Sequence, residues 1–234
     1  MEMDGKVAVV TGGSGAIGST LVRCLAVEGA TVVVADSRVP HDDALAQASA
    51  GTVSYVESDI TSEKSVISLV ADVEKAHGRL DALFNVAGGF RYGPAVDDLA
   101  EADWDSLLQL NLKSVFLCIK HVLPVMKQQN YGRIVSVAAR SGLKGDAMVA
   151  PYAVSKGGVI LLTQTTAEEV KDYDITANAV LPSIVDTPAN RESMADADFA
   201  AWVAPADLAA VMMFLASERA RAVTGAAIPV YNRA

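Results

Sequence analysis

Short apolar runs rich in valine and isoleucine recur along the chain, and segments with the amphipathic spacing of helices separate them. The apolar runs predict strands near residues 6–11, 31–35, 52–57, 81–85, 132–138, 175–181 and 227–230. The segments between them predict helices near 16–28, 42–50, 63–77, 101–129, 151–171 and 206–217, with the long 101–129 helix bent or interrupted. Strands that alternate with helices are typical of a parallel sheet covered on both faces. The sequence therefore predicts an α/β fold with a doubly wound parallel sheet of about seven strands.

No linker, repeat or low-complexity segment divides the 234 residues, so we expect a single domain over 1–234. The segment 183–204 has no clear period and is rich in Asp, Pro, Ala and Ser. A loop of this length is unusual in a compact domain unless it has a function. We therefore expect 183–204 to be a lid loop over the substrate.

A glycine-rich turn, Thr11–Gly18, connects the first predicted strand to the first predicted helix. Glycines in this context let the backbone approach a pyrophosphate, and the helix N-terminus offers free N–H groups. The candidate cofactor contacts here are Gly12, Ser14, Gly15, Ala16, Ile17 and Gly18. Asp36 ends the second predicted strand, where a carboxylate accepts hydrogen bonds from the adenosine ribose and repels a 2′-phosphate. This favours NAD over NADP, although Arg38 nearby is either a surface charge or a group that accommodates the phosphate.

Tyr152 and Lys156 lie four residues apart on a predicted helix, so their side chains project from one face. A phenol titrates near pH ~10, and a nearby ammonium favours the phenolate. We therefore expect Lys156 to lower the pKa of Tyr152 and make it a general acid/base.

Several candidate site motifs fall at the carboxyl ends of predicted strands. They are Gly12–Gly18, Asp36, Asp59, Asn85–Gly89, Ala138–Ser141 and Pro182–Thr187. Ligands of open parallel sheets bind beyond this edge, so we expect these residues to gather around one site.

The charge and composition exclude several classes of partner. A net charge of −9 and an isoelectric point near 4.8 argue against a nucleic acid or an anionic membrane. No basic and apolar leader opens the chain, and no apolar stretch is long enough to span a bilayer. Cys24 and Cys118 form no CxxC pair, and His41, His77 and His121 have no metal-ligand spacing. We expect a cytoplasmic, metal-free protein that acts on a small molecule.

Taken together, these residues resemble the short-chain dehydrogenase/reductase superfamily over essentially the whole chain. The matching pieces are Thr11–Gly18, Asp59-Ile60, Asn85-Val86-Ala87-Gly88, Asn111, the Tyr152/Lys156 pair, and Pro182 through Thr187. The resemblance implies a Rossmann-type fold, a nicotinamide cofactor, and a homotetramer or homodimer. Predicted helices 101–129 and 151–171 are apolar on more than one face, which also favours an oligomer unless the monomer itself buries them.

The resemblance also implies roles for single residues. Beyond the glycine-rich turn and Asp36, the implied cofactor contacts are Asp59, Ile60, Asn85, Ala87, Gly88, Tyr152, Lys156, Pro182, Ile184 and Thr187. Asp59 and Ile60 would flank the adenine ring, Lys156 would hold the nicotinamide ribose, and Thr187 would contact the carboxamide. Asn111 would bend the long helix and anchor a water in a proton relay to Lys156, which makes it the third catalytic residue.

The chain departs from the family pattern at three positions. Ala16 and Ser183 stand where glycines are usual, with Gly15 beside Ala16 able to preserve the turn. Ala139 stands where the family usually has a catalytic serine, thirteen residues before Tyr152. Ser141 would replace that hydroxyl only if the chain turns back after the strand; otherwise it is a turn residue before Gly142. Ala139 and Ser141 are candidate substrate contacts.

A second resemblance is local. The Ala87-Gly88-Gly89 turn and the segment 181–202 resemble quinonoid dihydropteridine reductases, which also lack the serine. Phe199 and Trp202 would then either stack on a flat heterocycle or plug the loop onto the core. The sequence thus favours an NAD(H)-dependent oxidoreductase acting on a small carbonyl, alcohol or conjugated substrate. A dihydropteridine reductase-like enzyme and an NAD-binding protein without catalysis are the alternatives.

Overall fold

The computed structural model describes residues 3–38 and 51–234 and contains a seven-stranded, all-parallel sheet in the order β3-β2-β1-β4-β5-β6-β7. The strands are β1 (Val7–Thr11), β2 (Thr31–Asp36), β3 (Thr52–Glu57), β4 (Ala82–Asn85), β5 (Gly132–Val137), β6 (Ile175–Pro182) and β7 (Ala227–Val230). All seven predicted strands are confirmed, with bounds that differ by one residue at most. The strand order reverses between β1 and β4, which pair in register from Ala8 with Ala82 to Thr11 with Asn85.

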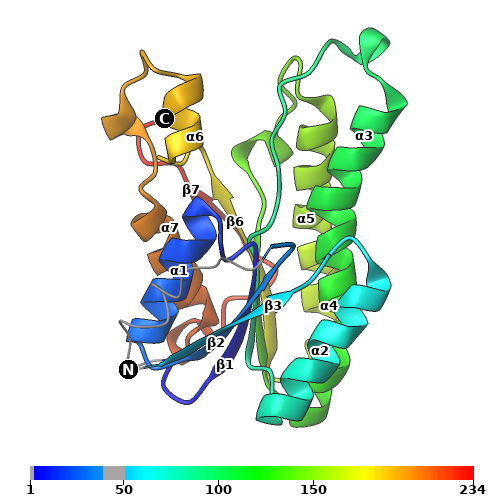
Figure 1. Cartoon of the computed structure of the whole chain (residues 1–234), viewed down its shortest axis with the longest axis vertical. Coiled ribbons are helices and arrows are strands. Elements are labelled where there is room, and N and C mark those ends of the chain that lie inside the picture. Colours follow the sequence, from blue (N-terminus) through cyan, green and yellow to red (C-terminus); the bar gives the residue numbers. More distant parts are fainter. Residues whose placement is uncertain (1–2, 39–50) are drawn as a thin grey trace.

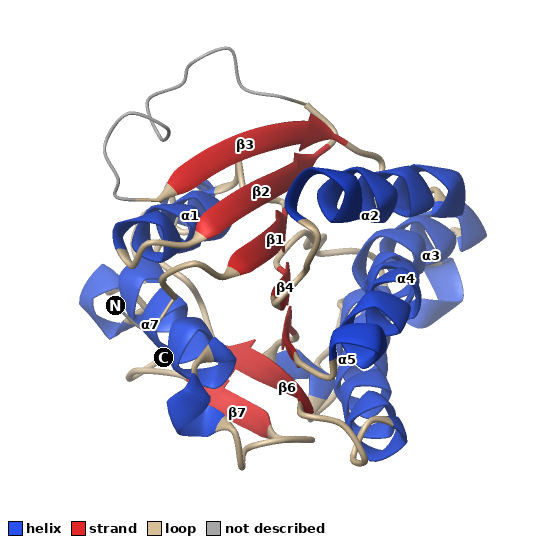
Figure 2. Ribbon diagram, turned by 90° about the horizontal axis from the view of Figure 1, so that it is seen from below, coloured by secondary structure: helices blue, strands red, loops and turns tan. Residues whose placement is uncertain are grey.

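Helices cover both faces of the sheet, as Figures 1 and 2 show. The helices α1 (Ala16–Val27) and α7 (Pro205–Ala216) lie on one face. The helices α2 (Glu63–His77), α4 (Ser114–Gln129) and α5 (Ala150–Glu169) lie on the other. The helix predicted at 42–50 lies outside the described residues. The predicted α/β, doubly wound fold is therefore confirmed.

The two faces of the sheet bury two separate apolar cores, because successive strand residues point to opposite faces. In β1, Val7 and Val9 join the core beneath α2, α4 and α5, whereas Ala8 and Val10 join the core beneath α1 and α7. Burial on both faces explains why the strands appear in the sequence as continuous apolar runs rather than alternating ones.

The long predicted helix 101–129 is interrupted, as expected. It consists of α3 (Glu101–Leu108), a π-helical turn at Gln109–Lys113, and α4. A π-helical turn is a bulge with one extra residue and is common at functional sites. Asn111 lies at the centre of this turn.

The segment 183–204 is more ordered than the predicted lid loop. It contains the short helix α6 (Pro188–Ser193) and a 3₁₀ turn at Phe199–Ala201. A parallel bridge between Val185 and Val203 holds its two ends together. No helix in the described part of the chain is long and apolar enough to cross a membrane.

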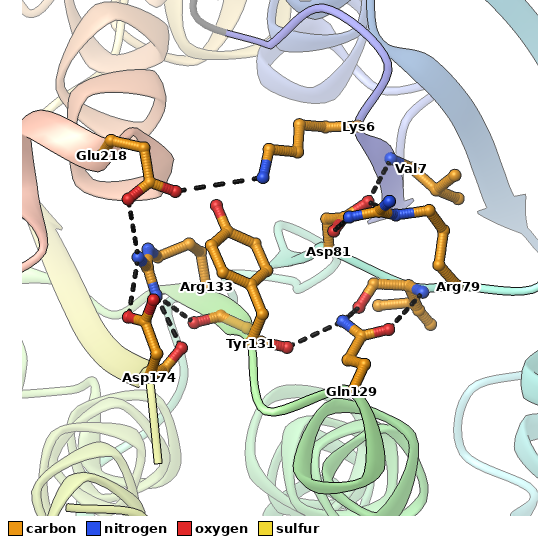
Figure 3. A network of polar contacts seen from close by, with 11 residues as sticks. Lys6, Val7, Arg79, Asp81, Gln129, Tyr131, Arg133, Asp174 and Glu218 are labelled. Atoms are coloured by element: carbon orange, nitrogen blue, oxygen red, sulfur yellow. Dashed lines mark hydrogen bonds and ion pairs between the residues drawn. The ribbon is translucent and has the colours of Figure 1, made fainter.

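A network of ion pairs and hydrogen bonds fastens the amino ends of the strands (Figure 3). The buried carboxylate of Asp81, just before β4, accepts hydrogen bonds from the Val7 N–H at 2.8 Å and from Arg79 at 2.6 and 2.7 Å. The fully buried Arg133 of β5 pairs with Asp174 at 3.0 Å and Glu218 at 3.4 Å. These contacts join β1, β4, β5 and the start of β6 at the edge opposite the glycine-rich turn.

Candidate active site

A cavity of about 810 Å³ lies at the carboxyl ends of the strands, beside the reversal point between β1 and β4. This is where open α/β sheets bind their ligands. Predicted cofactor residues that line it are Gly12, Ser14, Gly15, Ala16, Ile17, Gly18, Asp36, Asp59, Ile60, Ala87, Gly88 and Thr187. Residues far apart in the sequence therefore converge on one cavity, as their position at strand ends predicted.

Two glycines of the turn are required by geometry. Gly12 has φ of +66°, and a Cβ there would lie 2.7 Å from the Ala87 Cα. A Cβ on Gly18 would collide with the Gly12 backbone, so its absence lets α1 pack closely on the turn. Gly15 has an ordinary extended conformation as the N-cap of α1, and Ala16 is the first helical residue. Alanine is tolerated at position 16 because a helix start needs no positive φ.

The acidic residues of this cavity are already oriented. Asp36 Oδ2 accepts a hydrogen bond from the Ser14 N–H at 3.2 Å, which links the end of β2 to the glycine-rich turn. Asp59 Oδ1 accepts from the backbone N–H and hydroxyl of Thr61 at 2.9 and 2.7 Å. Arg38 lines the same cavity as Asp36.

Tyr152 and Lys156 lie one turn apart on α5, and Lys156 lies beside the lining of this cavity. The Lys156 side chain is 4% exposed, and its Nζ donates a hydrogen bond to the Val137 carbonyl at 2.7 Å. The same Nζ lies 5.9 Å from the centroid of the Tyr152 ring. A Cβ on Gly88 would come within 3.3 Å of Lys156 Nζ, so the β4 turn passes directly beside the ammonium.

The pKa of Tyr152 differs from the sequence expectation. Burial raises the pKa of the phenol to about 12 and lowers the pKa of Lys156 to about 8. The expected lowering of the Tyr152 pKa does not occur in this structure, because the ammonium is directed at the Val137 carbonyl rather than the phenol oxygen. Desolvation therefore outweighs the attraction between the two groups.

Asn111 connects three elements through its buried amide. Its Oδ1 accepts from the Gly89 N–H at 2.8 Å, and its Nδ2 donates to the Gly89 carbonyl at 2.9 Å and to the Ser155 hydroxyl at 3.2 Å. The interruption of the long helix thus places an amide where it holds the β4 turn against α5. The Asn111 side chain does not line the cavity described above.

A second cavity, of about 750 Å³, contains Tyr152. Ala139 and Ser141, the predicted substrate contacts after β5, also line it. The backbone is extended at Ala139 and then enters a 3₁₀ turn at Arg140–Gly142. This is the reversal that Ser141 needs to reach the site, and its hydroxyl has no hydrogen-bond partner among the described residues. Short helix α6 separates the cavities, with Pro188 and Ala189 facing the first and Asn190 the second.

Besides Tyr152 and Lys156, three predicted cofactor contacts do not line the first cavity. Asn85 is buried and donates to the Ser136 hydroxyl at 3.1 Å, so it supports the sheet and lines neither cavity. Pro182 and Ile184 line the second cavity rather than the first. Ser183, which stands where the family usually has a glycine, donates to the Tyr231 carbonyl at 2.7 Å and fastens this strand end to the segment after β7.

The predicted stacking role of Phe199 and Trp202 is not supported by their positions. Trp202 is buried in the core, and Phe199 packs against it with ring centroids 4.8 Å apart. Neither residue lines the second cavity. The alternative, in which the two rings plug the segment onto the core, matches the structure because the Val185–Val203 bridge draws Trp202 inward.

Sequence reasoning missed the aromatic wall of the second cavity. The ring of Phe90 meets the ring of Tyr152 edge-on, at 4.9 Å between centroids and 87° between planes. Tyr92, Asn190 and Met194 also line this cavity. Phe90 directly follows the Gly88-Gly89 turn at a strand end, which was the available signal.

The first cavity fits a dinucleotide. It combines a turn that a Cβ at Gly12 or Gly18 would obstruct, a helix N-terminus and an acidic strand end. Tyr152 and the buried Lys156 stand between this cavity and the second one, where a proton donor beside a hydride carrier would be placed. The arrangement is that of a nicotinamide-dependent oxidoreductase.

Comparisons with known proteins agree with this arrangement. Residues 6–198 match the family model described as short chain dehydrogenase. The chain is 33% identical over 241 residues to the 3-oxoacyl-[acyl-carrier-protein] reductase FabG of Thermotoga maritima, covering 98% of each protein. It is 32% identical to the D-beta-hydroxybutyrate dehydrogenase of Cupriavidus necator, covering 96% of this chain and 95% of that protein. The crystal structure of NAD⁺-bound xylitol dehydrogenase superposes with a TM-score of 0.90 at 29% identity, covering 98% of this chain and 99% of that one. The chain belongs to the short-chain dehydrogenase family, as the sequence motifs predicted, and is an oxidoreductase of that type.

Proposed function

We propose that this chain is an NAD(H)-dependent short-chain dehydrogenase that interconverts a carbonyl compound and its alcohol, with Tyr152 as the proton donor and acceptor. The observation that carries the proposal is the position of Tyr152 in the second cavity, one helical turn from a buried lysine beside the first. When bound, the nicotinamide supplies or accepts the hydride.

In the proposed complex, Gly12–Gly18 hold the pyrophosphate and Asp36 binds the adenosine ribose. Asp59 and Ile60 flank the adenine, Lys156 binds the other ribose, and Thr187 contacts the carboxamide. The carboxylate of Asp36 supports NAD over NADP because it would repel a 2′-phosphate. The similar xylitol dehydrogenase is NAD⁺-bound in its crystal structure, which supports the same preference.

Tyr152 is protonated at neutral pH, since burial raises its pKa to about 12. The phenol is therefore ready to donate a proton to a substrate oxygen during reduction. Lys156, with a pKa lowered to about 8, retains its proton over most of the neutral range and favours the transient phenolate. Asn111 positions Ser155 and Gly89 around this pair, and it remains our candidate for the water relay.

Ser141 is the proposed second hydrogen-bond donor to the substrate oxygen, in place of the serine that Ala139 lacks. The 3₁₀ turn after Ala139 and the unpaired Ser141 hydroxyl support this role. Two donors to one oxygen stabilise the charge that develops on it in the transition state.

The test is Tyr152→Phe, with turnover followed as NADH consumption on a panel of aldehydes, ketones and diketones. We expect kcat to fall by about 10²–10⁴, the usual contribution of a positioned general acid. Tyr173→Phe is the matched control, because Tyr173 is 39% exposed, lines neither cavity and should tolerate the change. Full turnover by Tyr152→Phe would exclude this mechanism.

A second candidate function is reduction of a quinonoid dihydropterin. Ala139 supports it, because a delocalised ring accepts hydride without concentrating charge on one oxygen and has less need of the missing hydroxyl. Freshly generated quinonoid pterin should then oxidise NADH faster than any simple ketone does. If it oxidises none, this candidate is excluded.

We also propose that the protein forms a homo-oligomer through the outer faces of α4 and α5. Phe116, Val154 and Leu161 are exposed there, at 45%, 48% and 66%. Apolar side chains gathered on neighbouring helices are typical of a subunit interface. Leu161→Glu should shift the mass measured by light scattering toward the monomer.

A further inference from the structure

The one basic side chain on the described lining of the second cavity already donates a hydrogen bond within the protein. Arg140 is its only basic residue among the described residues that line it, and Asp146 is its only acidic one. Arg140 Nη1 donates to the main-chain oxygen of Ala234 at 2.7 Å, and the guanidinium lies 5.7 Å from the centroid of the Tyr231 ring. An anionic substrate would therefore meet Asp146 and an already engaged guanidinium, which makes its desolvation costly.

Several neutral polar side chains of the cavity are also engaged. The Ser183 hydroxyl donates to the Tyr231 carbonyl, and the Asn190 amide donates to the Val185 carbonyl at 2.8 Å. The side-chain hydroxyls of Ser141 and Tyr152 have no hydrogen-bond partner among the described residues. The Tyr92 hydroxyl is also free among the described residues, but Tyr92 is 68% exposed, so Ser141 and Tyr152 are the less exposed hydroxyl donors that we assign to a substrate oxygen.

The mouth of the cavity is apolar and aromatic. Phe90 is 60% exposed, with its ring edge-on to Tyr152, and Met194 is 36% exposed. The Gly93 N–H donates to the Met148 carbonyl at 2.8 Å, which ties the Phe90 segment to the opposite wall. Exposed apolar rings around a cavity with few convergent polar groups are typical of a binding site for an apolar ligand.

From these observations we propose that the substrate is an uncharged, flat, apolar ring ketone or the corresponding alcohol. Its oxygen lies between Tyr152 and Ser141, and its ring packs against Phe90. The inference rests on the proposed dehydrogenase function and narrows it. It separates this chain from the hydroxybutyrate dehydrogenase relative, because the only described partner for the carboxylate of hydroxybutyrate is Arg140, which already binds Ala234.

The experiment compares a carboxy-β-tetralone with its methyl ester, which share a fused ring and differ in charge. Binding is measured by calorimetry in the presence of NAD⁺, and turnover by NADH consumption. We expect the ester to exceed the acid by at least about tenfold in both affinity and kcat/KM, since the carboxylate of the acid must be desolvated beside Asp146 and compete with Ala234 for Arg140. Phe90→Ala should raise KM for the ester about 3–10-fold, the range for one aromatic contact. Phe214→Ala, at an exposed phenylalanine on α7, is the control and should leave the KM for the ester unchanged.

The outcomes separate the two proposals. Equal or tighter binding of the acid would overturn the substrate class, and so would efficient oxidation of hydroxybutyrate. If Arg140→Met then lost the oxidation of hydroxybutyrate, Arg140 would be the group that binds the carboxylate, after leaving Ala234. Selective binding of the ester without any NADH consumption would leave the substrate class standing and overturn the proposed reaction.

Discussion

The two edges of the same sheet are built in opposite ways. At the amino ends of the strands, Asp81 and Arg133 are buried and held by several partners each. At the carboxyl ends, Ser141 and Tyr152 keep hydroxyls that are unpaired among the described residues, and Lys156 is buried with a perturbed pKa. One edge is held together by ion pairs and hydrogen bonds that stabilise the fold, whereas the other leaves hydroxyl groups available for a ligand. The difference predicts that substitutions at the two edges affect different measurements.

After Tyr152→Phe, the largest effect is expected at Ser141. Ser141→Ala should lower kcat on a ketone by about 10²–10³, the usual cost of removing one donor to a developing oxyanion. The free energy of unfolding in urea should not change, because the Ser141 hydroxyl has no hydrogen-bond partner among the described residues. The double variant Ala139→Ser/Ser141→Ala should recover much of the rate. A single variant with nearly full activity would mean that a backbone N–H or water fills the role.

Lys156→Met should change how the free energy of unfolding depends on pH. The folded state lowers the pKa of this lysine from 10.5 to about 8, so below about pH 8 the fold carries the full cost of a buried ammonium. By linkage, wild-type stability should rise as pH increases from about 8 to 10.5, by up to about 3 kcal/mol, and the variant should lack this rise. Urea unfolding at several pH values measures it. A variant less stable than wild type at neutral pH would mean that the hydrogen bond to Val137 outweighs the desolvation.

Asp81→Ala tests the opposite edge. It leaves the Val7 N–H buried without an acceptor, so the free energy of unfolding should fall by about 1–3 kcal/mol. The values of kcat and KM for NADH should not change, because the site lies at the other end of the strands. Asp172→Ala, at an exposed residue near the same edge, is the control and should stay within about 0.5 kcal/mol of wild type. A large loss of kcat in Asp81→Ala would contradict the separation of the two edges.

The smallest effect is expected at Asp36. Asp36→Ala should narrow the preference for NADH over NADPH by about tenfold, since a carboxylate no longer repels the 2′-phosphate. Steady-state kinetics with both coenzymes measure the ratio. Arg38→Gln is the companion variant, and it should leave the KM for NADH unchanged. If the wild-type enzyme already preferred NADPH, Arg38 would instead be the residue that binds the 2′-phosphate.

Local patterns were sufficient for the fold. The continuous apolar run Val7–Val10 and the helical spacing of Glu63–His77 predicted the elements found there, because the period of burial is written directly in neighbouring residues. The position of Asp36 and Gly12–Gly18 at strand ends likewise predicted that they share a cavity. The helix α6 was missed because Pro188–Ser193 is too short to show a period.

The sequence by itself determined the doubly wound sheet, the family and the identity of most residues that line the first cavity, since each depends on local period or motif. Only the tertiary structure decided that Trp202 is buried, that Phe90 stands against Tyr152, and that Ser141 turns into the second cavity. It also decided that burial raises the pKa of Tyr152 instead of the lysine lowering it. These properties depend on distances and desolvation between residues far apart in the chain, which spacing along the sequence does not encode.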